Sequence, residues 1–360
     1  MKTIQIKTNH HSYPVIIGSD ITEQLPYYLE KSGITKKTKI LIITDHHIAP
    51  LYLDVIKNVL SHFSVLTYII SAGEHSKSLQ EAEKIIQYAI ENGLDRSSLI
   101  LTLGGGVVGD LAGFVSAVYM RGIRFIQCPT TILAHDSSVG GKVGINHPLG
   151  KNLIGAFHQP EFVFYDTAFL KSLPIREIRS GLAEVIKEGL IRDDSFTEWL
   201  YDHAESLLQV NLEDMNDALL KGISVKAEIV QEDEKEMGIR AVLNYGHTLA
   251  HPIETISNYQ YLHGEAVAIG MVFASHLAFK LGMISEQTAI YTRDLISRFD
   301  LPTSIPSHYS DQELINIMMH DKKFKQSTTR FILPVKIGEV IIKDGIGFEI
   351  LSEAIEEMKN

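Results

Sequence analysis

The sequence predicts an α/β fold for the first half of the chain and a mainly helical second half. From residue 1 to about residue 170, buried-type apolar strands alternate with amphipathic helices, which indicates a parallel, doubly wound sheet. Long helical patterns then run through residue 299. A chain of 360 residues is also too long for one comfortable core, so we expect two domains, at residues 1–170 and 171–360.

Local patterns justify each element in turn. Residues 1–18 alternate like two short strands around a polar turn. Apolar runs predict buried strands at residues 39–45 and 97–103, and strand-like patterns also occur at residues 64–70 and 161–166. Helical patterns occur at residues 21–31, 51–61 and 79–90. Near the end of the chain, a strand-like segment at 331–338 precedes a closing amphipathic helix at 352–360.

Composition and charge exclude several classes of protein. The net charge of −11 argues against a protein that binds nucleic acid or acidic membranes, but it leaves room for a local basic pocket. Cys128 is the only cysteine, so any transition metal must use histidines and carboxylates, and Cys128 itself is interpreted as a small buried residue. No signal peptide or membrane-length apolar run is present, so we expect a cytoplasmic protein.

A glycine-rich turn follows the predicted strand at residues 97–103. Residues 104–109 fit G-x-G-x-x-G and lead into an apolar helix, where backbone N–H groups and the helix N-terminus favour a pyrophosphate. The alternative is a tight turn that only needs glycine. The acidic residue expected about twenty residues later is missing. Asp45 and Glu74 are the acidic candidates for the ribose hydroxyls, so a dinucleotide would bind a variant α/β domain.

Cations and small polar residues concentrate between residues 121 and 158. Cations on glycine-rich loops suit phosphate or polyhydroxy ligands, although each lysine taken singly could be a solvated surface residue. The set comprises Arg121, Thr130, Thr131, Asp136, Lys142, Lys151 and Asn152.

Three histidines mark the second half. His247 and His251 are four residues apart, hence on one face of a helix, and His263 begins the next apolar helical run. Such a group suggests a metal with an open coordination position, although the H-x-x-x-H spacing alone is a weak motif. Glu184 and Lys187 are neighbours on one helical face, either as a salt bridge or with Glu184 completing a two-His-one-carboxylate site.

Several ordered blocks resemble one family. AGEHSK, GGGVVGD, YMRG, PTTILAHDSSVGGKVGINHPLGKNLIGAF, RSGLAEVIK, LNYGHT and HGEAVAIGM together closely resemble 3-dehydroquinate synthases, which are sugar-phosphate cyclases. The resemblance spans nearly the whole chain, although Ala250 and Pro252 stand where glycine and alanine are commoner. A proline is tolerated in the first turn of a helix but is costly later, so Pro252 bears on the geometry of His251.

The resemblance implies ligands for both cofactors. Zinc, for which cobalt can substitute, would bind Glu184, His247 and His263. NAD would contact Asp45, Gly73, Glu74, Lys77, Gly106, Val107, Val108, Gly109, Asp110, Thr130, Thr131, Lys142, Lys151, Phe169, Leu170, Lys171 and Ser172.

The resemblance also implies a substrate site and a reaction. The expected catalytic set is Arg121, Asp136, Lys142, Asn152, Lys187 and His251, and the expected substrate-binding set is Lys142, Asn152, Lys187, Lys226, Arg240, Asn244, His251 and Lys323, with Lys322 as the alternative to the last. The family converts 3-deoxy-D-arabino-heptulosonate 7-phosphate (DAHP) to 3-dehydroquinate and phosphate through transient NAD-dependent oxidation, phosphate elimination, re-reduction and aldol closure. It is typically homodimeric.

Three other functions stay open at this point. A sister cyclase would make another carbocycle from a related sugar phosphate. A metal-dependent polyol dehydrogenase would accumulate NADH. A nucleotide-binding module would lack catalysis altogether.

Overall fold

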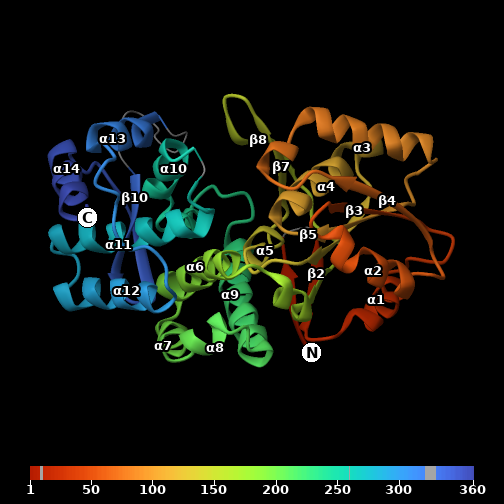
Figure 1. Cartoon of the computed structure of the whole chain (residues 1–360), viewed down its shortest axis with the longest axis horizontal. Coiled ribbons are helices and arrows are strands. Elements are labelled where there is room, and N and C mark those ends of the chain that lie inside the picture. The colour runs from red at the N-terminus through yellow and green to blue at the C-terminus, as the bar shows by residue number, and fades with distance from the viewer. Residues whose placement is uncertain (9–10, 259, 321–329) are drawn as a thin grey trace. The chain divides into compact units, whose positions relative to one another are not determined.

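The computed structural model describes residues 1–8, 11–258, 260–320 and 330–360. The chain separates into two compact units (Figure 1). The first unit consists of Met1–Leu173 together with Met215–Lys235, and the second of Pro174–Asp214 together with Glu236–Asn360.

A seven-stranded sheet forms the centre of the first unit. Its order across the sheet is β1 (Lys2–Lys7), β2 (Ser12–Gly18), β9 (Val163–Asp166), β6 (Arg124–Pro129), β5 (Leu99–Gly104), β3 (Lys39–Asp45) and β4 (Ser64–Ile70). Only the β1–β2 pair is antiparallel, and every other neighbouring pair is parallel. The predicted α/β class with a parallel sheet is confirmed.

Helices cover both faces of this sheet. Side chains alternate along β3, so that Ile40 and Ile42 join one core cluster while Leu41 and Ile43 join the other. The first cluster includes α1 (Leu25–Lys31) and α2 (Asp54–Val59), which continues a π-helical turn at Ala49–Leu53. The second includes α3 (Leu79–Glu91) and α4 (Gly106–Val118). Strands buried on both faces explain the continuous apolar runs in the sequence.

The strand order places two distant turns next to each other. The chain passes from β3 outward to β4 and then returns to the other side of β3 to form β5. In sheets of this kind, ligands bind outside the carboxyl ends of the strands where the winding direction reverses. Here those ends carry Asp45 after β3 and the glycine turn after β5. We call this region the cofactor edge.

A hairpin projects from the first unit where the sequence predicted a glycine-rich loop. Strands β7 (Lys142–His147) and β8 (Gly150–Phe157) pair antiparallel (Figure 1). Gly144 and Gly155 face each other, and a Cβ on Gly155 would lie 2.5 Å from the carbonyl oxygen of Val143. These glycines therefore permit close strand approach, a role that the sequence alone did not reveal.

Short helical segments connect the strands of the first unit. Helix α5 (Ala134–Ser137) precedes the hairpin. Turns of 3₁₀ helix lie at Thr22–Gln24, Glu74–Ser76, Tyr119–Arg121 and Thr167–Ser172.

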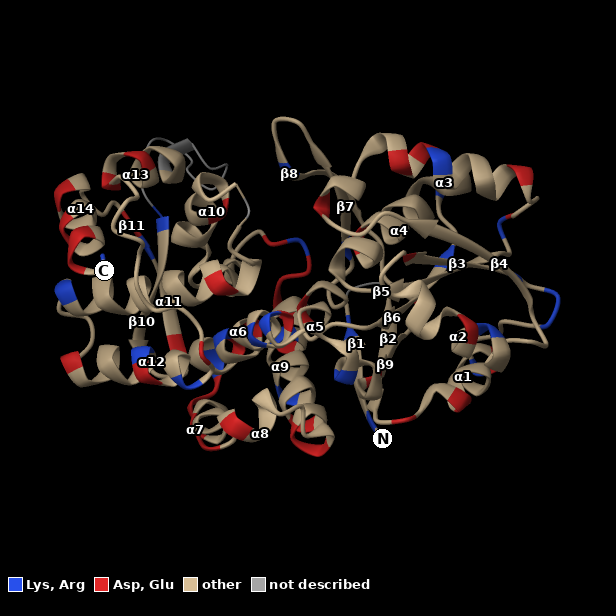
Figure 2. Ribbon diagram, viewed as in Figure 1, with Lys and Arg blue, Asp and Glu red and all other residues tan. Residues whose placement is uncertain are grey.

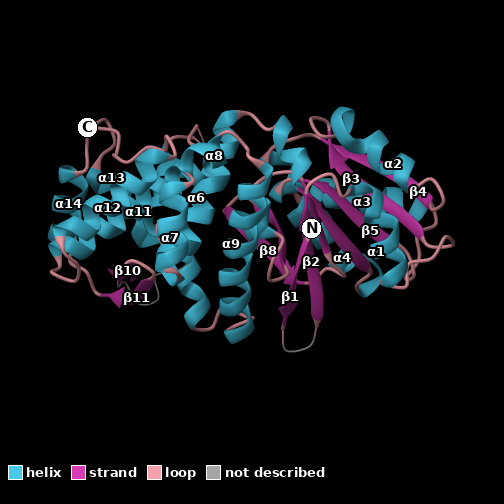
Figure 3. Cartoon of the chain, turned by 90° about the horizontal axis from the view of Figure 1, so that it is seen from below, coloured by secondary structure: helices cyan, strands magenta, loops and turns pink. Residues whose placement is uncertain are grey.

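The second unit is mainly helical, as predicted (Figure 3). Its elements are α6 (Ile175–Arg192), α7 (Asp194–Asp202), α8 (Ala204–Leu208), a 3₁₀ turn (Ile239–Asn244), α10 (His247–Ile256), α11 (His263–Lys280), α12 (Glu286–Arg298), α13 (Asp311–His320), β10 (Arg330–Lys336), β11 (Glu339–Asp344) and α14 (Phe348–Glu357). Helix α11 is the central one, because it contacts α6, α10, α12, α14 and β10. Among the described helices, none combines the length and apolarity needed to cross a bilayer.

The domain division differs from the predicted boundary at residue 170. The first unit ends at Leu173 and also includes most of α9 (Leu212–Glu232). Polar contacts attach α9 there: Lys226 Nζ lies 2.9 Å from Asp136 Oδ1, and Thr167 Oγ1 donates to Asn216 Oδ1 over 2.9 Å. A helical pattern in the sequence shows which face of a helix is apolar, but not which unit that face packs against. The predicted boundary therefore placed α9 in the second domain, with the helices next to it in the sequence.

Helices α10 and α11 cross at van der Waals contact, and this crossing gives a stability prediction. A Cβ added to Gly270 would lie 1.9 Å from the carbonyl oxygen of Gly246, a backbone atom that cannot rotate away. Gly270→Ala should therefore destabilise the protein by about 2–3 kcal/mol and lower the midpoint of thermal unfolding. Gly347→Ala is the control, because no atom lies within 4 Å of its added Cβ. Equal midpoints for the two variants would contradict the tight crossing.

Candidate functional site

Three donor groups converge in the second unit. Glu184 projects from α6, His247 from α10 and His263 from α11, and one ligand atom of each lies within 4.8 Å of the others. His263 Nε2 is 3.1 Å and His247 Nε2 3.4 Å from the same oxygen, Glu184 Oε1. One carboxylate and two imidazoles are a donor set that zinc prefers, and three protein ligands leave a coordination position open. The residues therefore fit the predicted metal.

Local sequence explains why both histidines point to the same place. Gly246 has a φ of +81°, a left-handed conformation that glycine adopts without strain, and α10 begins directly after it at His247. Helix α11 begins at His263, where Glu265 Oε2 accepts a hydrogen bond from the backbone N–H of Leu262 over 2.8 Å. Each of the two histidines is thus the first residue of its helix.

An outer shell orients the two imidazoles. His247 Nδ1 lies 3.1 Å from the carbonyl oxygen of Tyr245, and His263 Nδ1 lies 3.5 Å from Glu254 Oε1. Such partners fix the ring so that Nε2 is available to a metal. Glu254 was not predicted from the sequence, although it lies seven residues after His247 and hence on the same helical face.

Lys187 and Glu188 complete the buried cluster. Lys187 Nζ is 2.5 Å from Glu184 Oε2 and 3.4 Å from Glu188 Oε1, and all three side chains are buried. The two interpretations of Glu184, salt bridge or metal ligand, are therefore compatible, because each uses a different carboxylate oxygen. Glu188 was not singled out from the sequence.

His263 carries a strongly shifted pKa. Burial alone would lower the pKa of its imidazole, but hydrogen bonds to Glu184 and Glu254 outweigh that effect and raise the pKa to about 10. Buried carboxylates thus favour a positive charge at this point, which either a proton or a metal cation can provide.

Of the remaining residues predicted for the second unit, His251 lies beside this centre. The ring of His251 lies 5.7 Å from that of His247, centroid to centroid. Arg240 is buried, and Asn244 Nδ2 donates to Glu236 Oε1 over 3.0 Å. Glu236 is the last residue of the charged run EDEKE at 232–236. Lys322 and Lys323 lie outside the described residues.

Pro252 lies inside a helix beyond its first turn, which is the position where a proline is costly. Helix α10 begins at His247, so Pro252 falls inside the helix, beyond its first turn. Proline has no N–H to donate to the carbonyl of Thr248. The helix nevertheless continues to Ile256, because tertiary packing of its buried face outweighs the local cost.

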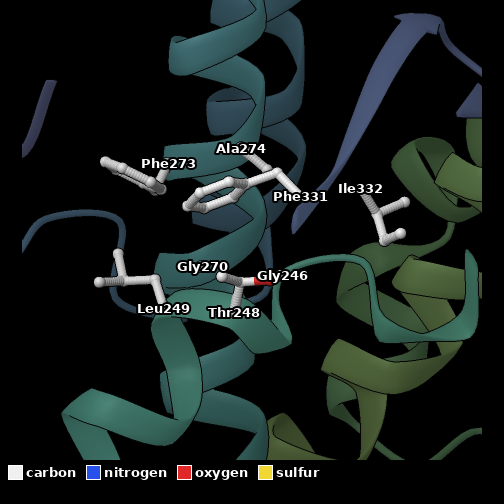
Figure 4. Close-up of a pocket in the computed structure, with 8 residues that line it drawn as sticks. All are labelled: Gly246, Thr248, Leu249, Gly270, Phe273, Ala274, Phe331 and Ile332. Atoms are coloured by element: carbon white, nitrogen blue, oxygen red, sulfur yellow. The ribbon is translucent and has the colours of Figure 1, made fainter. Parts of the chain in front are cut away.

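A shallow apolar hollow lies beside the ligand helices. Figure 4 shows Leu249 of α10, Phe273 of α11 and Phe331 of β10 around it, together with Gly246, Thr248, Gly270, Ala274 and Ile332. None of these eight residues is charged, so this hollow does not provide the chemistry of the neighbouring cluster.

The cofactor edge of the first unit has the features of an anion site. Helix α4 begins at Gly106, and an added Cβ on Gly105 would lie 2.9 Å from Thr131 Cγ2. A bare backbone therefore faces the N-terminus of α4, where free N–H groups favour a pyrophosphate. Nearby, the hydroxyl oxygen of Thr130 is buried without a hydrogen-bond partner in the part of the chain that the structure describes. These residues fit the predicted dinucleotide.

Several predicted cofactor residues also support the local fold. Asp45 Oδ1 accepts hydrogen bonds from the backbone N–H groups of His47 and Ile48. Phe169 packs on Tyr52 at 4.2 Å between ring centroids, and its carbonyl accepts the hydroxyl of Tyr52 over 2.9 Å. The remaining members of this predicted segment follow in the same 3₁₀ turn, namely Leu170, Lys171 and Ser172.

Lys77 joins predicted cofactor and substrate residues. Its Nζ donates to Asp110 Oδ2 on α4 over 2.7 Å and to Asn152 Oδ1 on β8 over 2.6 Å. Burial alone would lower the pKa of Lys77, but the carboxylates of Asp110 and Glu74 raise it. Lys77 therefore stays cationic at neutral pH.

The other predicted residues of the first unit lie on α5, α9 and the hairpin. Asp136 and Lys226 form a second charged pair, with 2.9 Å between Oδ1 and Nζ. Lys142 lies on β7 and Lys151 on β8.

Arg121 lies away from the cofactor edge. It follows the C-terminus of α4, whose 13 residues separate it from the glycine turn by about 20 Å. Met120 and Arg121 both have positive φ, 51° and 69°, and the Arg121 side chain is exposed. One copy of the first unit does not bring Arg121 together with the other residues predicted at this edge.

Comparisons with known proteins place this fold and site in a class. The solved structure of 2-deoxy-scyllo-inosose synthase complexed with carbaglucose-6-phosphate, NAD⁺ and Co²⁺ superposes with a TM-score of 0.91 at 26% identity, covering 99% of this chain and 100% of that one. The structure of 2-epi-5-epi-valiolone synthase from Streptomyces hygroscopicus gives a TM-score of 0.89 at 24% identity over 98% of both chains, which shows the same fold. The fold is that of the sugar-phosphate cyclases.

Sequence comparison narrows the class to one family. The family descriptions "3-dehydroquinate synthase N-terminal" and "3-dehydroquinate synthase C-terminal" match residues 67–180 and 181–324. The 3-dehydroquinate synthase of Desulforamulus reducens is 46% identical over 98% of this chain and 99% of the relative, and that of Geobacillus thermodenitrificans 49% identical over 93% and 92%. The chain belongs to the 3-dehydroquinate synthase family.

The shifted pKa of His263 predicts how metal binding depends on pH. A metal ligand must be the neutral imidazole, whereas His263 without metal is protonated below a pKa of about 10. Zinc binding near pH 8 should therefore release about one proton, and zinc affinity should rise with pH up to that pKa. Calorimetric titration of zinc in buffers with different ionisation enthalpies measures the release. Binding without proton release would contradict the assignment.

The contact between Glu254 and His263 gives a second prediction. Glu254→Gln should reduce zinc affinity by about 10-fold to 100-fold, because the imidazole loses the carboxylate that orients it. Competition with a chromogenic chelator measures this affinity. Glu349→Gln, an exposed change on α14, is the matched control and should leave zinc affinity unchanged. Equal affinities for the two variants would remove Glu254 from the outer shell.

Proposed function

We propose that this chain is a 3-dehydroquinate synthase. It would convert DAHP to 3-dehydroquinate and phosphate, as a carbon–oxygen lyase acting on phosphates. The observation that carries the proposal is the Glu184–His247–His263 triad, in a chain 46% and 49% identical to two relatives that bear this name.

The proposed cofactors are NAD and a divalent metal, zinc or cobalt. The donor set of the triad and the glycine edge of the first unit support them, as does the cyclase structure that contains NAD⁺ and Co²⁺. When bound, the metal supplies Lewis acidity at substrate hydroxyls and NAD⁺ supplies a reversible hydride acceptor.

The residues of the second unit would bind and orient the substrate. Lys187 is held against Glu184 by a 2.5 Å contact, so its charge lies at the metal centre, beside any oxygen that the metal binds. His251 is adjacent to His247 and is the group that would take the proton from the hydroxyl to be oxidised. Arg240 and Asn244 would clamp an anionic end of the substrate.

The first unit would contribute its own polar groups. Asn152 and the lysines at 142 and 226 would bind substrate oxygens, while Asp136 holds Lys226 in place over 2.9 Å. The main task of these residues would be to position the substrate.

Two properties of the whole protein complete the proposal. We place the enzyme in the cytoplasm and expect a homodimer. Arg121 supports dimerisation, because it lies at the far end of α4 from the cofactor edge of its own copy and a second copy could bring it to that edge.

The decisive test follows phosphate and NADH together. Zinc-loaded protein with DAHP and substoichiometric NAD⁺ should release many phosphates per NAD⁺ without accumulating NADH, because the hydride returns to the substrate. Glu184→Gln should abolish this turnover, whereas Glu349→Gln should retain it. Stoichiometric NADH without phosphate would instead mean a dehydrogenase, and a product other than 3-dehydroquinate by mass would mean a sister cyclase.

A further inference from the structure

The hairpin of the first unit contains an irregularity beside the cofactor edge. In the strand pairing, Ile145 faces Ile154 and the next pair is His147 with Gly150. The chain therefore advances by two residues on β7 but by four residues on β8. The extra residues of β8 form a bulge, and Asn152 within it has a φ of +52°. Bulges of this kind redirect a side chain, and asparagine tolerates the left-handed conformation better than most residues.

Asn146 lies opposite this bulge and is bonded on both sides. Its Oδ1 accepts the backbone N–H of Asn152 over 3.0 Å, and its Nδ2 donates to Glu74 Oε2 over 2.9 Å. Its own backbone N–H donates to the carbonyl of Lys77 over 2.8 Å. The side chain therefore connects the turn after β4 with the bulge of β8.

A carboxamide satisfies both partners. Glu74 as a carboxylate requires a donor, and the N–H of Asn152 requires an acceptor, so one side chain must offer both. Aspartate would keep the acceptor but would place a second negative charge beside Glu74. Alanine would remove both bonds.

Lys77 closes the same network from the other end. It donates to Asn152 Oδ1 over 2.6 Å and lies 4.0 Å from Glu74 Oε2. The backbone of Asn152 is thus held by Asn146 and its side chain by Lys77, and both of these residues also contact Glu74.

We infer that Asn146 is a positioning residue that links dinucleotide binding to substrate binding. It orients the Glu74 carboxylate toward a ribose hydroxyl and holds Asn152 in the left-handed conformation that presents its carboxamide to the substrate. The inference rests on the proposed function, in which Glu74 binds NAD and Asn152 binds DAHP. Binding at either end should stabilise the same arrangement, so each ligand should increase affinity for the other by an equal factor.

Direct binding of NADH tests the Glu74 side without turnover. In Asn146→Asp, the affinity measured by NADH fluorescence should fall about 10-fold to 100-fold, because the donor to Glu74 becomes a repelling charge. The variant retains an acceptor for Asn152. Asn146→Ala should weaken NADH binding and also raise the KM for DAHP at saturating NAD⁺.

A reversed pair separates positioning from a general structural role. In a protein that already carries Glu74→Gln, the new amide can donate a hydrogen bond to the carboxylate that Asn146→Asp introduces. Adding Asn146→Asp to this variant should therefore lower its NADH affinity by less than about threefold. The inference would be overturned if Asn146→Asp lowered NADH affinity by the same factor in the original protein and in the Glu74→Gln variant. An unchanged affinity in Asn146→Asp alone would also overturn it.

Controls match charge and location. Asn58→Asp adds the same charge to exposed α2, and Leu149→Ala changes the exposed tip of the same hairpin. Both should bind NADH like the original protein, and Asn146→Asp should keep its zinc content and unfolding midpoint.

The outcomes distinguish this inference from the proposed function. If the original chain binds NADH but does not release phosphate from DAHP, the proposed function fails. The NADH affinities of the Asn146 and Glu74 variants would still show whether Asn146 orients Glu74. If the chain turns over DAHP and Asn146→Asp binds NADH normally, only the inference fails.

Discussion

The buried carboxylate of Glu184 is the constraint on which the second unit depends. A buried negative charge is costly unless cations or hydrogen-bond donors surround it. Here Lys187 takes one oxygen and the two imidazoles face the other, which requires α6, α10 and α11 to meet at one point. Tight packing fixes this meeting point: a Cβ on Gly264 would lie 1.8 Å from the carbonyl oxygen of Ser180, which explains why glycine follows His263.

The first unit solves a different problem, which is to order polar groups at the edge of a sheet. Parallel strands bring their carboxyl ends to one edge, and the reversal between β3 and β5 opens space there for a ligand. The polar network of Lys77, Asp110, Asn146 and Asn152 then fastens the hairpin to this edge. The hairpin lysines are thereby carried on an ordered strand pair rather than on an irregular loop.

Three buried lysines of this protein are paired with carboxylates, although the chain as a whole is acidic. Figure 2 shows acidic residues spread over helices of both units, and the excess of 44 acidic over 33 basic residues gives the net charge of −11. The cations that matter for chemistry are mostly held by carboxylates inside: Lys77 by Asp110, Lys187 by Glu184 and Lys226 by Asp136. A net negative protein can therefore bind an anionic sugar phosphate, because the substrate meets these local pairs rather than the average charge.

The sequence by itself determined the class of fold and the glycine turn, because period, strand length and residue type are local properties that need no knowledge of distant partners. Local patterns left Glu184 open between a salt bridge and a metal ligand, and only the resemblance to a family implied the complete ligand set. Tertiary structure alone decided that Asp45 and Gly104 end neighbouring strands, that α9 joins the first unit, and that Asn146 faces a bulge. It also decided that Glu254 supports His263 and that Arg121 lies far from the glycine turn. These facts depend on which surfaces pack together, and segments far apart in sequence acquire that relation only when the chain folds.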